Sequence, residues 1–201
     1  MKTIFKTRII SFILAATFLI SCSDDDNDST NNVCKEVDSG ISQGLITAFS
    51  NVAGYDDLPE YMDLETHQYT IKINTDGEIC SIGYRNPSTY TGSYTMEISN
   101  VTSGNNYTGV HSFSQSATSY VSITPITVQS GDVIKVKRTI LPGYGLLNKT
   151  IGRIFRKSDF TNVPYPITAG NVEFLSSDFY GAGGPVPNIG QPYITLGFKL
   201  N

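Results

Sequence analysis

Residues 69–84 read Tyr-Thr-Ile-Lys-Ile-Asn-Thr-Asp-Gly-Glu-Ile-Cys-Ser-Ile-Gly-Tyr, and they decide the fold class. Apolar and polar residues alternate from Tyr69 to Asn74, which is the two-residue period of a half-buried strand. Asp76-Gly77 predicts a tight turn, and Ile79–Tyr84 is expected to return as a second strand. One apolar face and one polar face are typical of antiparallel sheets that are packed on one side.

The same alternation recurs along the rest of the chain, in segments 93–98, 121–124, 133–140, 172–174 and 193–200. Ser130-Gly131-Asp132 predicts a turn before the third of them. In the last segment, one face is expected to carry Ile194, Leu196, Phe198 and Leu200. Short strands that are separated by turn signals predict an all-β protein, an antiparallel β-sandwich of jelly-roll or Ig-like type. Residues 34–48 are expected to form a short helix or an irregular lead-in.

The N-terminus has the parts of a secretory signal. Lys2, Lys6 and Arg8 form a positive region, and Ile9–Ile20 follows as an apolar run. This run is shorter than the roughly 20 residues that a membrane-spanning helix needs. The sequence therefore predicts an exported protein.

The residues around Cys22 resemble known sorting signals. Leu19-Ile-Ser-Cys22 resembles a bacterial lipobox, and Ser23-Asp24-Asp25-Asp26 resembles the acidic export signal of surface lipoproteins in the Bacteroidota. The resemblance implies a palmitate-type lipid anchor on Cys22 and an outer-membrane location that faces the cell exterior. A plain cleaved signal, with a cysteine there by chance, and an uncleaved anchor are the alternatives.

The resemblance divides the chain into three parts. Residues 1–21 are the lipoprotein signal peptide, 22–43 the lipidated cysteine with a flexible acidic tether, and 44–201 the β-sandwich domain. The tether is polar and poor in apolar residues, so it cannot bury enough surface to fold. Without the signal, 11 basic residues face 18 acidic ones, and such an acidic chain is a poor general nucleic-acid binder.

Acylation of Cys22 would leave two cysteines. Cys34 and Cys80 can then pair in an oxidising envelope. Alternatively, both stay unpaired, with Cys34 in the tether and Cys80 buried as a small apolar residue.

Three longer stretches carry a second resemblance. Tyr69–Tyr84, Val128–Val136 and the region from Val172 to Phe198 are similar to single-domain β-sandwich surface lipoproteins of the Bacteroidota whose function is uncharacterised. This resemblance covers most of residues 60–201 and rests on the layout of strands and turns. It implies fold and location, and it carries over no catalytic or binding residue.

Residues for catalysis and metal binding are scarce. His67 and His111 are the only histidines, and the chain has no CxxC, HxxxH or G-x-S-x-G pattern. We therefore expect no catalytic residues, no metal site and no cofactor. A carboxylate-rich stretch offers oxygen ligands for calcium, but a solvated acidic loop fits its spacing better: Asp56, Asp57, Glu60, Asp63 and Glu65.

Exposed aromatic rings are a common platform for sugars, and several tyrosines lie in turn-like contexts. Tyr90 and Tyr144 are the main candidates, beside the alternative that tyrosines fill the rims of a sandwich. The other candidates are Tyr55, Tyr61, Tyr84, Tyr107, Tyr165 and Tyr180.

Basic residues gather in one segment of 23 positions: Lys135, Lys137, Arg138, Lys149, Arg153, Arg156 and Lys157. Two strands, near 133–141 and 151–157, are expected to pair as a hairpin with Lys135, Lys137 and Arg153 as ligand-binding residues. Such a basic face suits an anionic glycan, lipid headgroups or an acidic partner. The alternatives are an internal match to the acidic N-terminal part and a solubilising face.

These patterns favour a non-catalytic binding module for a glycan or for an envelope or host component. The alternative is a structural or accessory subunit of a cell-surface assembly, such as a pilus-like or nutrient-uptake complex. The expected partners are the membrane, through the lipid anchor, and an anionic glycan or another surface protein, with no nucleic acid. A hydrolase is the least favoured reading.

The lipid anchor is tested by fatty-acid labelling. Cys22→Ala is expected to abolish incorporation of a fatty-acid analogue, because the acylated thiol is gone. Replacing Asp24, Asp25 and Asp26 with Ala serves as the control: labelling persists, while protease shaving of intact cells no longer removes the protein. Equal labelling of Cys22→Ala and wild type contradicts the anchor.

Overall fold

The computed structural model describes residues 34, 40–50, 52–61, 64–88, 90–141, 152–181 and 183–201. Cys22, the Ser23–Asp26 signal and Tyr144 lie outside these residues. The described part is mostly antiparallel β-structure, as the sequence predicts. No helix within it is long and apolar enough to cross a membrane.

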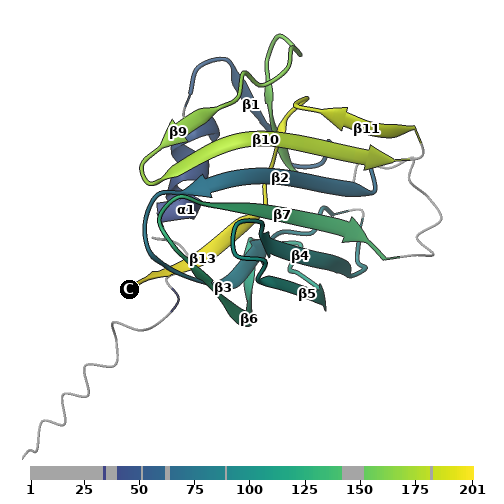
Figure 1. Ribbon diagram of the computed structural model, residues 1–201. Helices are drawn as coiled ribbons and strands as arrows, with labels where there is room; N and C mark the ends of the chain where they lie inside the picture. Colours follow the sequence, from purple (N-terminus) through teal and green to yellow (C-terminus); the bar gives the residue numbers. More distant parts are fainter. Residues whose placement is uncertain are drawn as a thin grey trace, which may run out of the picture. The chain divides into compact units, whose positions relative to one another are not determined.

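The strands form three antiparallel sheets (Figure 1). The large sheet has the order β11 (Gly184–Pro187), β10 (Val172–Gly181), β2 (Thr66–Ile73), β7 (Asp132–Ile140), β4 (Tyr94–Asn100) and β5 (Asn106–His111), with β9 (Ile167–Ala169) also paired to β10. The second sheet has the order β13 (Thr195–Leu200), β3 (Gly77–Tyr84) and β6 (Ser119–Val128). A small third sheet has the order β1 (Tyr55–Leu58), β8 (Ile154–Lys157) and β12 (Gln191–Pro192).

The main core lies between the large sheet and the second sheet. Tyr69, Ile71 and Ile73 are buried, while Thr70 and Lys72 between them are partly exposed, so β2 has the predicted alternation. On the second sheet, Ile79 and Ile82 belong to the same apolar cluster. The Tyr69 hydroxyl donates a hydrogen bond to the Ile194 carbonyl at 2.6 Å, which satisfies a polar group inside the core.

The prediction that β3 returns along β2 is wrong. β2 pairs with β7 and β10, whereas β3 pairs with β6 and β13 in the other sheet. The alternating pattern identifies each strand and its inner face, but it does not say which strand is the neighbour. The segment between Ile73 and Gly77 is therefore a corner at which the chain crosses from one sheet to the other.

A second corner lies directly against the first. β6 and β7 cross between the same two sheets through residues 129–131, and Gly131 there has a φ of 97° that favours glycine. Its amide donates to the Ile73 carbonyl at 2.7 Å, and the Ser130 amide donates to the Asp76 carboxylate at 2.7 Å. The two corners thus continue the β2–β7 and β3–β6 ladders as one folded ribbon.

The carboxylate of Asp132 is buried at this corner, where it accepts hydrogen bonds from the Gln129 amide and from the Asn100 side chain. The Asn100 oxygen accepts in turn from the amides of Thr102 and Ser103. These bonds connect the two corners to the β4–β5 turn.

Gly77 is required by packing and not by the turn. A Cβ at this position would lie 2.3 Å from the Lys199 carbonyl oxygen and 2.5 Å from the Phe198 ring. The residue belongs to β3 and lets β13 approach the corner closely.

The folded ribbon distinguishes the two sandwich types that the sequence left open. In a jelly roll, paired strands run on from one sheet into the other, and β2–β3 with β6–β7 does this over its whole length. The consecutive hairpin of β4 and β5 beside β7 completes the order β2-β7-β4-β5 in the large sheet. The domain is therefore a jelly-roll sandwich.

The ordered domain starts before residue 44, so that predicted boundary is wrong. The helix α1 (Gly40–Leu45) and the π-helical turn η2 (Ile46–Ser50) precede β1. Ile41 is buried in the core, and the Ser42 hydroxyl donates to the Leu196 carbonyl at 3.1 Å. Thr195 and Gly197 in β13 are buried as well as Leu196, with Thr195 bonded to the Gly83 carbonyl and Gly197 packed against Ser81 and Cys34.

The last strand departs from its pattern in one place. Ile194, Leu196 and Phe198 are buried as expected, but Leu200 is 64% exposed. Leu200 pairs with Gly77 at the end of the sheet, beyond the core.

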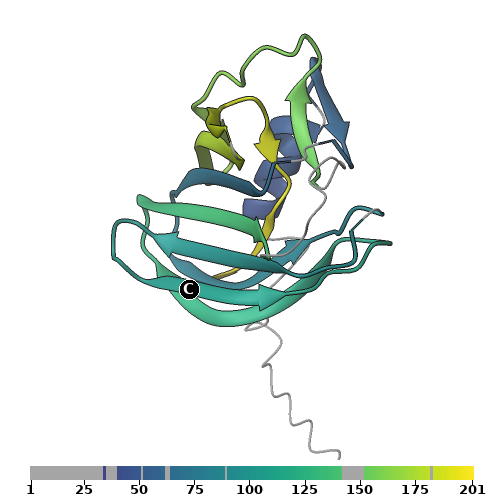
Figure 2. The same cartoon turned by 90° about the vertical axis from the view of Figure 1, so that its right-hand side faces the viewer.

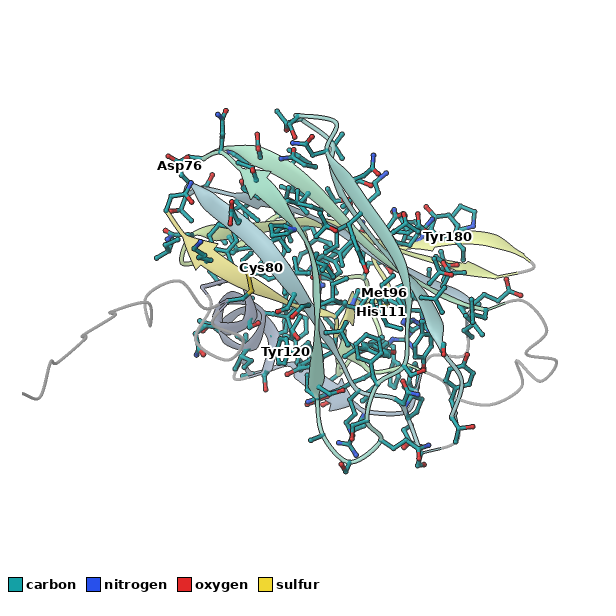
Figure 3. All side chains as sticks on the ribbon, turned by 90° about the horizontal axis from the view of Figure 1, so that it is seen from below. Asp76, Cys80, Met96, His111, Tyr120 and Tyr180 are labelled. Atoms are coloured by element: carbon teal, nitrogen blue, oxygen red, sulfur yellow. A yellow bond between two sulfur atoms is a disulfide. The ribbon has the colours of Figure 1, made fainter. Side chains whose placement is uncertain are left out.

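Cys34 and Cys80 form a disulfide with a Cα–Cα distance of 5.9 Å. In Figure 3, Cys80 lies on β3, well away from Asp76 at the corner. Both ladders of β3 shift register beside Cys80, so the crosslink meets the strand at an irregularity. The disulfide joins the start of the domain to the second sheet.

Removing the disulfide is expected to destabilise the domain. It closes a loop with a sequence separation of 46, for which the chain-entropy model gives about 3–4 kcal/mol. Urea unfolding of the Cys34→Ser/Cys80→Ser variant measures the loss. Thiol titration of the unfolded, unreduced wild type is the control, and two free thiols there contradict the bridge.

Candidate functional site

The predicted basic hairpin does not exist. β7 lies between β2 and β4 in the large sheet, whereas β8 pairs with β1 and β12. Lys135 and Lys137 do share the outer face of β7, but Arg153 directly precedes β8 of the small sheet. The prediction failed because two nearby cationic strands in the sequence need not be neighbours in space.

Within the described residues, acidic side chains pair with three of the seven basic residues, Lys137, Arg153 and Lys157. Lys137 pairs with Glu97 at 2.8 Å, and Lys157 pairs with Asp159 at 3.2 Å. Lys135 is exposed and forms no ion pair with the residues that the structure describes. Of these pairs, only Arg153–Asp57 is the predicted match to the acidic N-terminal part, while Glu97 and Asp159 lie outside that part.

Arg153 contacts the acidic N-terminal part directly. Its Nε donates to Asp57 Oδ1 at 2.8 Å and its Nη2 donates to Oδ2, a bidentate pair. Burial disfavours the charged guanidinium, but Asp57 outweighs this effect and raises the pKa of Arg153 above its ordinary value. The guanidinium also lies 3.8 Å from the Tyr193 ring centroid. Arg153 therefore fastens β8 to β1 and is not free for a ligand.

Arg138 and His67 are interior residues. They stand opposite each other in the β2–β7 ladder, and both are fully buried. The Arg138 guanidinium lies 4.9 Å from the Tyr94 ring centroid and donates to the Leu64 carbonyl at 3.5 Å. Burial, and then the charge of Arg138, lower the pKa of His67 well below its ordinary value, so His67 is neutral. Neither residue contributes to a surface site.

Tyr90, a predicted sugar platform, is 2% exposed, so that prediction is wrong. Its ring packs on Tyr94 with centroids 4.8 Å apart, and its hydroxyl donates to the Ser93 carbonyl at 2.7 Å. The turn folds back and uses the ring to close one end of the core. Tyr84 is buried as well.

The acidic stretch does not form a cation site in the described residues. Asp56 accepts from Ser158, Asp57 from Arg153, and Glu60 from Ser88. Across the described part of the chain, no three His, Cys, Asp or Glu side chains are grouped so that they could hold a metal ion. His111 shares a 2.6 Å hydrogen bond with the Tyr107 hydroxyl.

The two aromatic side chains that are exposed among the described residues lie together. Tyr61 is 37% exposed and Phe160 is 60% exposed. Both contact Arg156, whose guanidinium lies 5.3 Å from the Tyr61 ring centroid and 4.6 Å from the Phe160 ring centroid. Arg156 Nη1 also donates to the Tyr61 hydroxyl. We call Tyr61, Arg156 and Phe160 the aromatic–arginine cluster.

The small sheet positions this cluster. β1 and β8 lie side by side as a separate pair of strands (Figure 2). One face of the pair places Leu58 and Ile154 against Phe179 in a second apolar cluster. Arg156 is two residues from Ile154 in β8, so it lies on the same face, beyond that apolar contact.

Hydrogen bonds fix the segment that carries Tyr61. The Tyr61 amide donates to the Gly152 carbonyl at 3.1 Å. The preceding Glu60 accepts from the amide and hydroxyl of Ser88, and these bonds lower the pKa of Glu60. Tyr61 is thereby attached to the strand that carries Arg156.

Phe160 has a strained backbone, with a φ of 60° that bulky residues rarely adopt. Its amide donates to the Lys157 carbonyl at 2.9 Å, which closes a turn after β8. Asp159 accepts from the amide and hydroxyl of Thr161, and these bonds lower the pKa of Asp159 to about 2. An exposed aromatic side chain on a strained backbone, in a turn that is fixed by hydrogen bonds, is typical of a functional position.

Sequence reasoning named Tyr61 and Arg156 among larger groups but missed Phe160. The available signal was an aromatic residue inside the polar turn Ser158-Asp159-Phe160-Thr161, where Asp159 is suited to bond the backbone two residues on. No known protein-family model matches the chain, and no curated protein matches it. The aromatic–arginine cluster is therefore the candidate functional site of the described residues.

The positive φ of Phe160 predicts that glycine at this position gives a more stable protein than alanine, the reverse of the usual order. Phe160→Gly is expected to be more stable than Phe160→Ala by about 1 kcal/mol, because only glycine adopts a positive φ at little cost. Both variants lack the ring, so its contacts cancel in the comparison. Urea unfolding measures the difference, and a more stable Ala variant contradicts a strained turn.

Proposed function

We propose that this chain is an outer-membrane-anchored, surface-displayed lipoprotein whose jelly-roll domain binds carbohydrate and does not catalyse. The observation that carries the proposal is the aromatic–arginine cluster. Both rings are exposed to solvent, and the Arg156 guanidinium, a hydrogen-bond donor, lies over them. Sugars present the complementary chemistry, with apolar C–H faces and hydroxyl rims.

Two further considerations support the proposal. Jelly rolls are a common architecture of lectin domains, although a fold alone does not determine function. The positive φ of Phe160 costs free energy, and an exposed phenylalanine offsets little of this cost through packing in the core. A ligand that packs on the exposed ring would offset this cost in the bound state.

A second candidate function is an accessory subunit of a cell-surface assembly. It is favoured by β5, which forms one edge of the large sheet and carries the exposed Val110. An edge strand can pair with a strand of another protein. β5 has only six residues, so we rank this candidate second.

Binding to immobilised polysaccharides tests the proposal. Phe160→Ala and Tyr61→Ala are each expected to weaken binding of the full chain by about tenfold, since loss of a stacked ring costs about 1–3 kcal/mol in comparable ring-stacking sites. Leu200→Ala is the matched control, because Leu200 is equally exposed but lies at the end of β13. Binding that all three variants retain excludes the cluster as the site.

A further inference from the structure

The charges around the aromatic–arginine cluster offset one another. The small sheet and its turns carry three cations, Arg153, Arg156 and Lys157. The same described segments, 55–61 and 152–161, carry four carboxylates: Asp56, Asp57, Glu60 and Asp159. Arg85, whose charge also acts on Glu60, makes the count four to four, so the surroundings of the cluster are close to neutral; the whole chain has a net charge of −4.

The carboxylates are placed where they affect a ligand. Asp56 stands directly opposite Arg156 in the β1–β8 ladder, and Asp159 is the residue before Phe160. Asp159 is exposed and keeps its charge, because its two hydrogen bonds with Thr161 lower its pKa. An anionic polymer would meet these negative charges, at a cost that falls as salt screens them.

From this charge balance we infer that the cluster binds a neutral carbohydrate, with a sugar ring on Phe160 and Tyr61 and its hydroxyls between Arg156 and Asp56. The inference rests on the proposed function and replaces the anionic ligand that the linear run of basic residues predicted. Hydroxyl groups both donate and accept hydrogen bonds, so they can use the guanidinium and the carboxylate together. The carboxylate group of an acidic sugar only accepts hydrogen bonds, so it can use the guanidinium but is repelled by Asp56.

A comparison of polymers tests the inference. The full chain, purified in detergent, is applied to neutral glucan, mannan, galactan and xylan, and to polygalacturonate, hyaluronan and heparin. We expect it to bind at least one neutral polymer, with less than about a twofold change between about 0.02 M and 0.5 M salt. Phe160→Ala is expected to remove this binding, and Leu200→Ala is expected to keep it.

Asp56→Asn gives a test whose sign differs between the two ligand classes. The amide oxygen can still accept from Ser158, so the turn is retained. For a neutral ligand, we expect affinity to fall about threefold or more, because a charged acceptor is lost. For an anionic ligand, affinity would rise, because a repelling charge is removed.

The outcomes separate the two levels of the argument. Phe160-dependent binding that is confined to acidic polymers, falls with salt and rises in Asp56→Asn overturns the neutral ligand and leaves carbohydrate binding in place. Absence of Phe160-dependent binding to every polymer overturns carbohydrate binding itself. Capture of a protein partner through the cluster, without polysaccharide binding, does the same.

Discussion

The whole domain depends on two corners that are bonded to each other. The β2–β3 and β6–β7 crossings are held together by the hydrogen bond from Gly131 to Ile73 and by the bond from Ser130 to Asp76. Because the ladders continue through them, the register of the large sheet determines the register of the second sheet. A slip of one residue at either corner would turn the apolar faces of both sheets outward. The buried Asp132–Asn100 pair makes such a slip costly, since it would leave polar groups without partners.

Much of the fold follows from the sequence, and the reasons are local. Alternation places Tyr69, Ile71 and Ile73 on the inner face of β2, because a strand has a period of two whatever its neighbours are. The same logic cannot show that Asp76-Gly77 is a corner and not a hairpin, because both need a reversal at that point. The partner of a strand is a long-range property, set here by packing between sheets and by the close approach of Phe198 to Gly77.

The candidate site was harder to predict for a related reason. A local charge pattern shows only residues that are close in the sequence, whereas Arg153 pairs with Asp57, which is 96 positions away. Three cations of a run that looks unmatched in the sequence are therefore paired with carboxylates in three dimensions. Tyr90 and Phe160 show the same effect for aromatic residues, since both lie in polar turns but only Phe160 is exposed. Whether a turn folds inward or outward depends on space in the core, which no short pattern records.

The disulfide limits the length of chain between the proposed lipid anchor and the folded domain. With Cys22 as the proposed point of attachment, the chain from Cys22 to Cys34 can span at most about 40 Å. The next described residue is Gly40 in α1, and the six residues from Cys34 to Gly40 span at most about 20 Å when extended. Attachment at Cys34 in place of Gly40 thus reduces the maximum length of the connecting chain by about a third. Under the proposed function, this disulfide therefore limits how far from the membrane the domain can bind polysaccharide.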